Sequence, residues 1–122
     1  LKAKHLSNAL LQLAEEGVTR VFKPYLENTF VVAVVGQLQF EVLADRIKTE
    51  YDVEVKFEPA ALYTALWVES DDSKELKRFT DSNQATIAED HDGSPVFLAR
   101  NQWHLNKTKE DWSKIRFLKT KS

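Results

Sequence analysis

Residues 34–51 read VVGQLQFEVLADRIKTEY and change their hydrophobic pattern at one glycine. The run from Phe30 to Val35, before that glycine, is wholly apolar, which predicts a short strand covered on both faces. From Leu38 to Tyr51, apolar residues recur every three or four positions, which predicts an amphipathic helix. Because glycine lacks a Cβ, we expect Gly36 to turn the chain from strand to helix without a loop.

The elements around this join complete the first half of the chain. Leucines on one stripe predict a helix from Lys2 to Glu16, and Gly17 supplies the stop. A strand is predicted over residues 18–23, ended by Pro24, because proline removes a ladder donor. Residues 53–57 alternate apolar and charged side chains, which predicts a strand with one wet face.

The second half contains strand and helix signals in a similar order. Residues 64–69 read as a strand, and Asp72 to Glu75 resembles a capping box that opens a helix with Leu76, Phe79 and Ile87 inward. A further strand is predicted over residues 95–100. Asn101 is expected to cap a helix that runs through Trp112, and residues 115–119 to form the last strand.

This order of elements predicts an α+β protein, a two-layer α-β plait (ferredoxin-like) with a mostly antiparallel sheet. We expect residues 1–60 to form the plait without its first strand. Residues 61–122 would then form an appended smaller α/β lobe packed on it. The chain begins at Leu1 and contains no methionine, so we expect it to be a piece of a longer protein.

Composition limits the environments and partners. Nineteen acidic and seventeen basic side chains give a net charge of -2, so no overall attraction to nucleic acid or to a membrane is expected. No cysteine is present, which excludes disulfides and thiolate chemistry and fits a reducing compartment. The longest apolar run, Phe30 to Val35, is too short to span a bilayer.

The sequence offers no recognisable catalytic set. Three glycines cannot build a phosphate-binding loop, and the three histidines lack metal-ligand spacing. The run Asp90 to Gly93 is similar to the start of a calcium loop but lacks the ligands that should follow, so a solvated turn is the favoured interpretation. We therefore predict that this chain is not an enzyme and binds no cofactor or metal itself.

Basic side chains gather near the C-terminal end. Two interpretations stay open: contacts to phosphates with aromatic rings stacked on bases, or a solvated face above core aromatics. Lys2 and Lys4 lie at the wrong end of their helix for its dipole, which suggests an outside partner. The C-terminal bases are Lys107, Lys109, Lys114, Arg116, Lys119 and Lys121, and the aromatic residues among them are Trp103, Trp112 and Phe117.

The run from Gly36 to Val42, with Asp45 to Lys48 and Glu50-Tyr51 after it, resembles a known signature. It is similar to the strand-to-helix join in the third domain of translational GTPases of the elongation factor G class. Elongation factor G has an acid and a histidine where Gln37 and Gln39 stand here. The glutamines and Trp67-Val68-Glu69 are more similar to the C-terminal domain of the bacterial class II peptide chain release factors, release factor three.

This resemblance implies a non-catalytic domain of a cytoplasmic GTPase that promotes departure of the stop-codon-reading release factors from the ribosome. It further implies that GTP and Mg²⁺ bind to a separate GTPase domain. The implied partners are ribosomal RNA and protein and the GTPase and barrel domains of the same protein. Gln37 and Gln39 are expected to face one of them, or alternatively only to cap the helix. The alternative function is a regulatory plait that binds a small metabolite.

Overall fold

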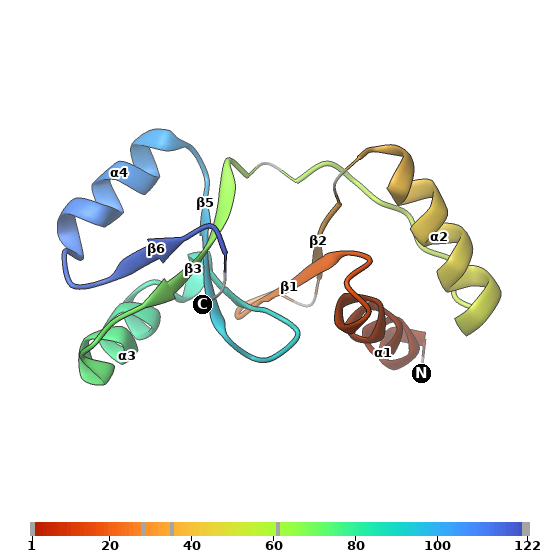
Figure 1. The fold of residues 1–122 in the computed structure, drawn as a ribbon, viewed down its shortest axis with the longest axis horizontal. Coiled ribbons are helices and arrows are strands. Elements are labelled where there is room, and N and C mark those ends of the chain that lie inside the picture. The colour runs from red at the N-terminus through yellow and green to blue at the C-terminus, as the bar shows by residue number, and fades with distance from the viewer. Residues whose placement is uncertain (1, 28, 35, 61, 121–122) are drawn as a thin grey trace. The chain divides into compact units, whose positions relative to one another are not determined.

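The computed structural model describes residues 2–27, 29–34, 36–60 and 62–120 (Figure 1). These residues form four α-helices and a six-stranded sheet whose assigned pairs are antiparallel, which confirms the α+β class. The helices are α1 (Lys2–Glu15), α2 (Leu38–Tyr51), α3 (Ser73–Ser82) and α4 (Gln102–Asp111). The strands are β1 (Arg20–Pro24), β2 (Val31–Ala33), β3 (Thr64–Glu69), β4 (Ile87–Glu89), β5 (Pro95–Ala99) and β6 (Arg116–Leu118), in the sheet order β2-β1-β4-β5-β3-β6.

The chain divides into two compact units. The first unit comprises Leu1–Val21 and Val31–Pro59, which carry α1 and α2. The second comprises Phe22–Phe30 and Ala60–Ser122, which carry α3, α4 and the strands β3 to β6.

The second unit contains a complete α-β plait. From β3 to β6 the elements follow the order β-α-β-β-α-β, and the strands lie in the order β4-β5-β3-β6. The first and third strands of this motif, β3 and β5, are therefore the central pair, as a ferredoxin-like unit requires. Leu66 pairs with Phe97 and Val68 with Phe117 in the ladder. The predicted fold class is thus confirmed, but this plait lies between Thr64 and Leu118, whereas the prediction placed it over residues 1–60, and the appended lobe is not confirmed.

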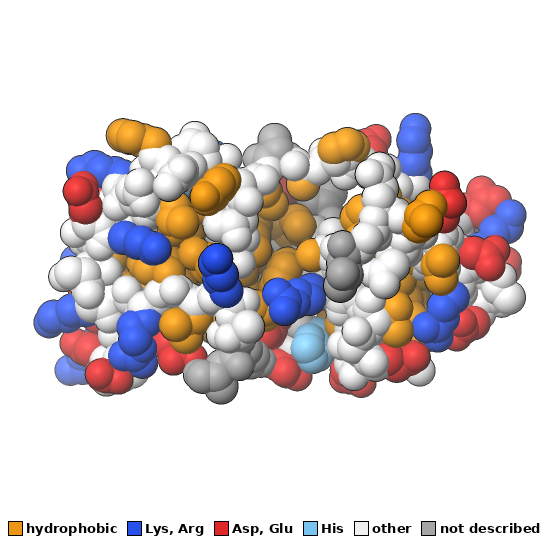
Figure 2. All heavy atoms as spheres, turned by 45° about the horizontal axis from the view of Figure 1, so that its top comes forward, with side chains coloured by type: hydrophobic (Ala, Val, Ile, Leu, Met, Phe, Trp, Pro, Cys, Tyr) orange, Lys and Arg blue, Asp and Glu red, His pale blue; other side chains and the backbone are white. Residues whose placement is uncertain are grey.

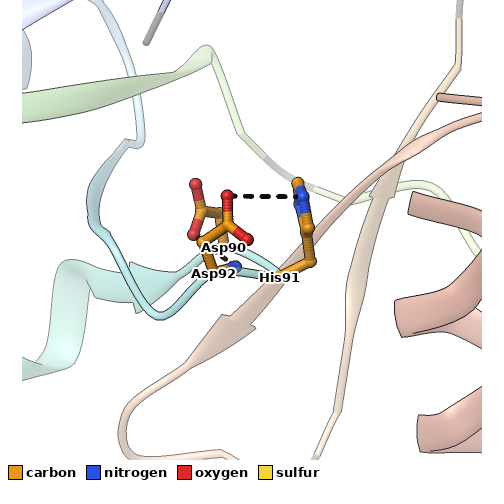
Figure 3. A group of neighbouring side chains, drawn as sticks. All are labelled: Asp90, His91 and Asp92. Carbon is orange, nitrogen blue, oxygen red and sulfur yellow. Dashed lines mark hydrogen bonds and ion pairs between the residues drawn. The ribbon is translucent and has the colours of Figure 1, made fainter. Parts of the chain in front are cut away.

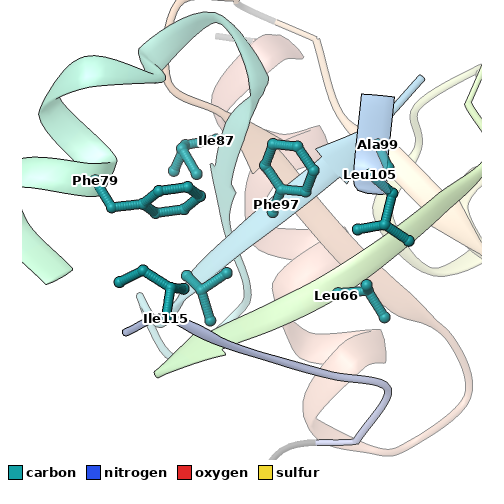
Figure 4. Close-up of a cluster of buried hydrophobic side chains, with 8 residues drawn as sticks. Leu66, Phe79, Ile87, Phe97, Ala99, Leu105 and Ile115 are labelled. Carbon is teal, nitrogen blue, oxygen red and sulfur yellow. The ribbon is translucent and has the colours of Figure 1, made fainter. Parts of the chain in front are cut away.

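The core of this plait lies between its helices and its sheet. Phe79 on α3 is fully buried, and its ring lies 5.9 Å from that of Phe97 between centroids (Figure 4). The Phe79 ring also contacts those of Trp112 and Phe117, at centroid distances of 5.1 and 5.7 Å. Leu105 brings α4 into the same cluster. The other members are Leu66, Val68, Ile87, Ala99 and Ile115, with Leu76 packed against them. Burial of these large side chains is the main stabilising contribution to this unit.

The first unit is built on the contact between α1 and α2 (Figure 1). Its buried side chains include Ala9, Leu10, Leu13, Leu43 and Ile47. The helix α1 ends in a Schellman motif: the N–H of Gly17 donates to Ala14 and that of Val18 donates to Leu13, both at the backbone oxygen. Gly17 has a φ of 80°, so the predicted glycine stop is confirmed. The Tyr51 hydroxyl donates to Oε1 of Gln12 at 2.8 Å and ties the two helices together.

The strand predicted over residues 53–57 is wrong. Residues 52–60 form neither helix nor strand, although Val53 is buried and Glu54 and Lys56 are exposed. The alternation of exposed and buried side chains is therefore real. It does not make a strand, because a strand also needs a hydrogen-bonded neighbour.

The prediction that Phe30 to Val35 form a strand buried on both faces is also wrong. Only Val31–Ala33 forms a strand, and Phe30 to Val34 are half-buried instead of covered on both faces. Val35 lies outside the described residues. A Cβ added to Gly36 would meet nothing within 4 Å, so no close approach requires glycine at the join.

The sequence interpretation missed the strand β4. The predicted helix that reached Ile87 ends at Ser82, where Asn83 donates its side-chain Nδ2–H to the carbonyl of Phe79. A short 3₁₀ turn follows over Gln84–Thr86, and Ile87 begins β4. The predicted cap is confirmed at Asp72, whose side chain accepts from the N–H groups of Lys74 and Glu75, but the capping box is not closed, because the N–H of Asp72 donates to Oγ of Ser70.

Candidate functional site

The first turn of α2 carries the two glutamines that the family resemblance singles out. Gln37 and Gln39 are both exposed, and the Gln37 side chain makes no capping hydrogen bond. Between them, Leu38 is 77% exposed, and Val42, one turn later on the same side, is 57% exposed. The ten residues from Gly36 to Asp45 contain two acids and no base. We call Gln37, Leu38, Gln39 and Val42 the α2 surface, which is apolar at its centre and weakly acidic around it.

The basic residues near the C-terminal end are dispersed over several elements. Lys107 and Lys109 lie on α4, Lys114 follows α4, Arg116 lies on β6 and Lys119 follows β6. All five are exposed, and Lys121 lies outside the described residues. On the face drawn in Figure 2, Lys and Arg side chains are interspersed with apolar and acidic ones instead of forming one continuous field.

Two of these bases are committed to carboxylates. Arg116 binds Asp71 at 3.1 Å and Glu69 at 3.5 Å, and the hydrogen bond and charge of Asp71 raise the pKa of Arg116. Lys107 pairs with Asp111 at 3.2 Å on the surface of α4. Within the part of the chain that the structure describes, Lys109, Lys114 and Lys119 form no ion pair. These three charges are the ones most available to an anionic partner.

The three aromatic residues of this region have different roles. Trp112 and Phe117 both pack against Phe79 in the core, and the Arg78 guanidinium lies over the Trp112 ring at 4.7 Å. For these two side chains the interpretation as core aromatics is confirmed. Trp103 is different, since it is 72% exposed on the first turn of α4.

The sequence interpretation did not name Arg100 as a contact residue; it lies directly before Asn101, the cap of α4. Its backbone N–H donates to Nδ1 of His104 at 3.1 Å, and the His104 ring packs on Phe97. Burial, and then the positive charge of Arg100, lower the pKa of His104. The signal was available, because the ten residues from Arg100 to Lys109 contain three bases and no acid. We call Arg100, Trp103, Lys107 and Lys109 the α4 surface.

The remaining predicted contact residues lie on α1. Lys2 is the first residue of this helix, and the Lys4 side chain is exposed. Neither residue lies on the α2 or the α4 surface as defined above.

Asp90, His91 and Asp92 bring three metal-ligating atoms within 4.8 Å of one another (Figure 3). The Asp90 side chain is buried, and Oδ1 accepts from the N–H groups of Asp92 and Ser94 at 2.9 Å. Oδ2 accepts from the Trp67 indole N–H, also at 2.9 Å. Gly93 completes the turn with a φ of 81°. Because Oδ1 of Asp90 closes this turn and Oδ2 joins it to Trp67 on β3, the geometry favours the predicted turn over a metal site.

Among the described residues, the two most exposed large apolar side chains are Leu38 on the first turn of α2, in the first unit, and Trp103 on the first turn of α4, in the α-β plait, which fits an interaction domain. The family model described as "Class II release factor RF3, C-terminal domain" matches residues 1–109, so the chain belongs to this family. The resemblance inferred from the Gly36 to Val42 run is confirmed. The chain is therefore a domain of a translation-termination factor. Of the helices in the described ranges, none has the length and apolar character needed to cross a bilayer.

Proposed function

We propose that this chain acts as the non-catalytic C-terminal domain of a termination GTPase that promotes departure of the stop-codon-reading release factors from the ribosome. The observation that carries the proposal is the family match over residues 1–109. In this proposal GTP and Mg²⁺ bind to a separate domain of the parent protein in the cytoplasm. This chain contacts the ribosome and the neighbouring domains.

The α2 surface supports the interdomain part of the proposal. An exposed leucine and an exposed valine on one side of a helix lose unfavourable contact with water when a protein partner covers them. No base lies between Gly36 and Asp45 to attract RNA phosphates, so a protein surface is the better partner here. Gln37 and Gln39 flank this apolar centre, and their amides can both donate and accept hydrogen bonds.

The test uses the full-length release factor that carries this domain, with Leu38→Asp and Val42→Asp introduced together. We expect the rate at which it removes release factors from post-termination ribosomes to fall at least ten-fold, because two desolvated apolar contacts are replaced by charges. The matched control is Leu11→Asp on α1, where the native side chain is 36% exposed. Equal rates for all three proteins would refute the interdomain role of the α2 surface.

A second double variant tests the two glutamines separately from the apolar residues of the α2 surface. Gln37→Ala with Gln39→Ala removes four hydrogen-bonding groups and leaves the apolar centre in place. We expect slower recycling and reduced ribosome-stimulated GTP hydrolysis. Unchanged values for both would mean that the two glutamines contact neither the ribosome nor another domain during recycling.

A further inference from the structure

Trp103 is a large apolar side chain whose exposure the fold itself does not explain. It is 72% exposed, whereas Trp67 is 8% exposed and Trp112 packs on the core. On α4, Leu105 and Thr108 are the buried side chains, and Trp103 lies nearly opposite to them around the helix axis. An indole that is mostly exposed to water contributes little to the stability of the plait, because the hydrophobic contribution grows with the area that is buried. It is therefore available to a partner.

The charges around Trp103 indicate the kind of partner. Lys107 lies one turn after it on the same side of α4, and Arg100 lies three residues before it. No carboxylate occurs between Arg100 and Lys109, and the next residue, Glu110, lies two turns along α4 from Trp103. The nearest acid pairing, between Lys107 and Asp111, joins two half-exposed side chains at 3.2 Å, and a phosphate can replace such a surface pair.

His104 adds a neutral, ordered neighbour to this surface. Because its pKa is lowered, it remains uncharged at neutral pH, and its Nδ1 accepts from the backbone N–H of Arg100. This contact fixes the backbone of Arg100 at the start of α4. The backbone position from which the Arg100 side chain extends is therefore fixed.

We propose that Trp103 stacks on an unpaired base of single-stranded RNA while Arg100, Lys107 and Lys109 contact the flanking phosphates. Proteins commonly hold single-stranded nucleic acids with an exposed aromatic ring that lies among Lys and Arg side chains. The α2 surface shows the contrast, because its apolar residues lie among acids and suit a protein partner. The inference rests on the proposed function, which supplies ribosomal RNA as the natural strand.

The first experiment titrates an end-labelled, mixed-sequence single-stranded RNA of ten nucleotides with the 122-residue chain at low salt and follows the fluorescence anisotropy of the label. We expect saturable binding by the wild type and binding at least ten-fold weaker for Trp103→Ala. Trp103→Phe should keep most of the affinity because a ring remains. Trp103→Leu, which is apolar but not aromatic, should bind as weakly as Trp103→Ala.

The control is Tyr25→Ala, which removes another exposed aromatic ring. The pKa of Tyr25 is raised by burial and by Glu89 and Asp81, so its surroundings are acidic and should repel RNA. We expect this variant to bind as the wild type does. Equal binding by wild type and Trp103→Ala, or full rescue by Trp103→Leu, would overturn the proposal. The rescue by leucine would identify Trp103 as an apolar anchor for a protein instead.

The salt dependence examines the phosphate contacts. Replacing Arg100, Lys107 and Lys109 together by alanine should make the slope of log affinity against log salt shallower by about 2, since each neutralised phosphate of a single strand contributes about 0.7. An unchanged slope would exclude these bases from the contact.

A parallel measurement with purified ribosomes separates this inference from the proposed function. Suppose that the wild-type factor and its Trp103→Ala variant recycle release factors equally fast and bind RNA equally well. This result would reject the RNA contact and leave the proposed function intact. RNA binding that depends on Trp103, in a factor that does not promote release-factor departure, would reject the proposed function and retain the RNA contact.

Discussion

The helices α2 and α4 begin in similar ways and present opposite chemistry. Each follows a strand, β2 or β5, and each places one large apolar side chain in water on its first turn, Leu38 at 77% and Trp103 at 72% exposed. The ten residues that begin two before Leu38 contain two acids and no base, whereas the ten that begin two before Trp103 contain two bases and one acid, with Arg100 directly ahead of them. The same local geometry can therefore serve two partners, and the neighbouring charges select between them.

The largest effect expected from a substitution is on the cores that hold these two helices. Phe79→Ala should lower the free energy of unfolding by about 3–5 kcal/mol, and Leu43→Ala by about 2–5 kcal/mol, because both side chains are at most 1% exposed. Chemical denaturation measures both values. A single shared transition in both variants would show that one cooperative fold presents the two surfaces, and a loss below 1 kcal/mol would contradict the described packing.

The next effect concerns how each helix starts. The Asn101 side chain accepts a hydrogen bond from the N–H of His104, whereas Gln37 makes no such bond. Asn101→Ala should therefore cost about 1 kcal/mol of stability, and Gln37→Ala only a few tenths. Thermal unfolding of the two variants measures the difference. Equal losses would mean that both helices are capped alike, which would remove this distinction between the surfaces.

A smaller effect should appear as a dependence on pH near neutrality, which α4 has through His104 and which α2, a helix without histidine, lacks. The pKa of His104 is lowered from 6.5 in the folded chain. As the pH falls below that value, the unfolded chain therefore binds more protons than the folded chain does. Stability that is complete above pH 6.5 should decline as the solution becomes more acidic. Repeating the denaturation series with His104→Gln should flatten this part of the profile, and an unaltered profile would assign it to other groups.

The smallest effect expected is that of removing the exposed side chains themselves. Leu38→Ala and Trp103→Ala should each change stability by less than about 0.5 kcal/mol, because neither side chain belongs to a core. Calorimetry of the two variants provides the measurement. A larger loss in either one would give that side chain a structural role and weaken the argument for a partner at that helix.

The sequence predicted the elements whose signals are local. Periodicity was sufficient for α1 and α2, and the side-chain oxygens of Asp72 and Asn101 marked the starts of α3 and α4. The strand β4 was missed because its three residues are too few to show a period. It exists through its pairing with β5 and β1. Residues 53–57 show the reverse case, a strand pattern without a neighbour to complete it.

Part of the candidate site was equally open to prediction. The Gly36 to Val42 run located the α2 surface, but not the exposure of Leu38 at its centre. Near the C-terminal end the sequence treated Trp103, Trp112 and Phe117 as one group. Only the packing of Phe79 separates them, since it takes Trp112 and Phe117 into the core and leaves Trp103 outside. That separation depends on side chains distant in sequence.

The pairing of Arg116 has a consequence for the solubility of the chain. Strand β6 forms one margin of the sheet, and Arg116 stands directly opposite Glu69 on β3 while also reaching Asp71. A charged residue on a strand of only three residues discourages a second molecule from adding its own strand there. Concentrated samples should therefore resist fibrous growth through β6, and replacement of Arg116 by an aliphatic residue would remove that protection.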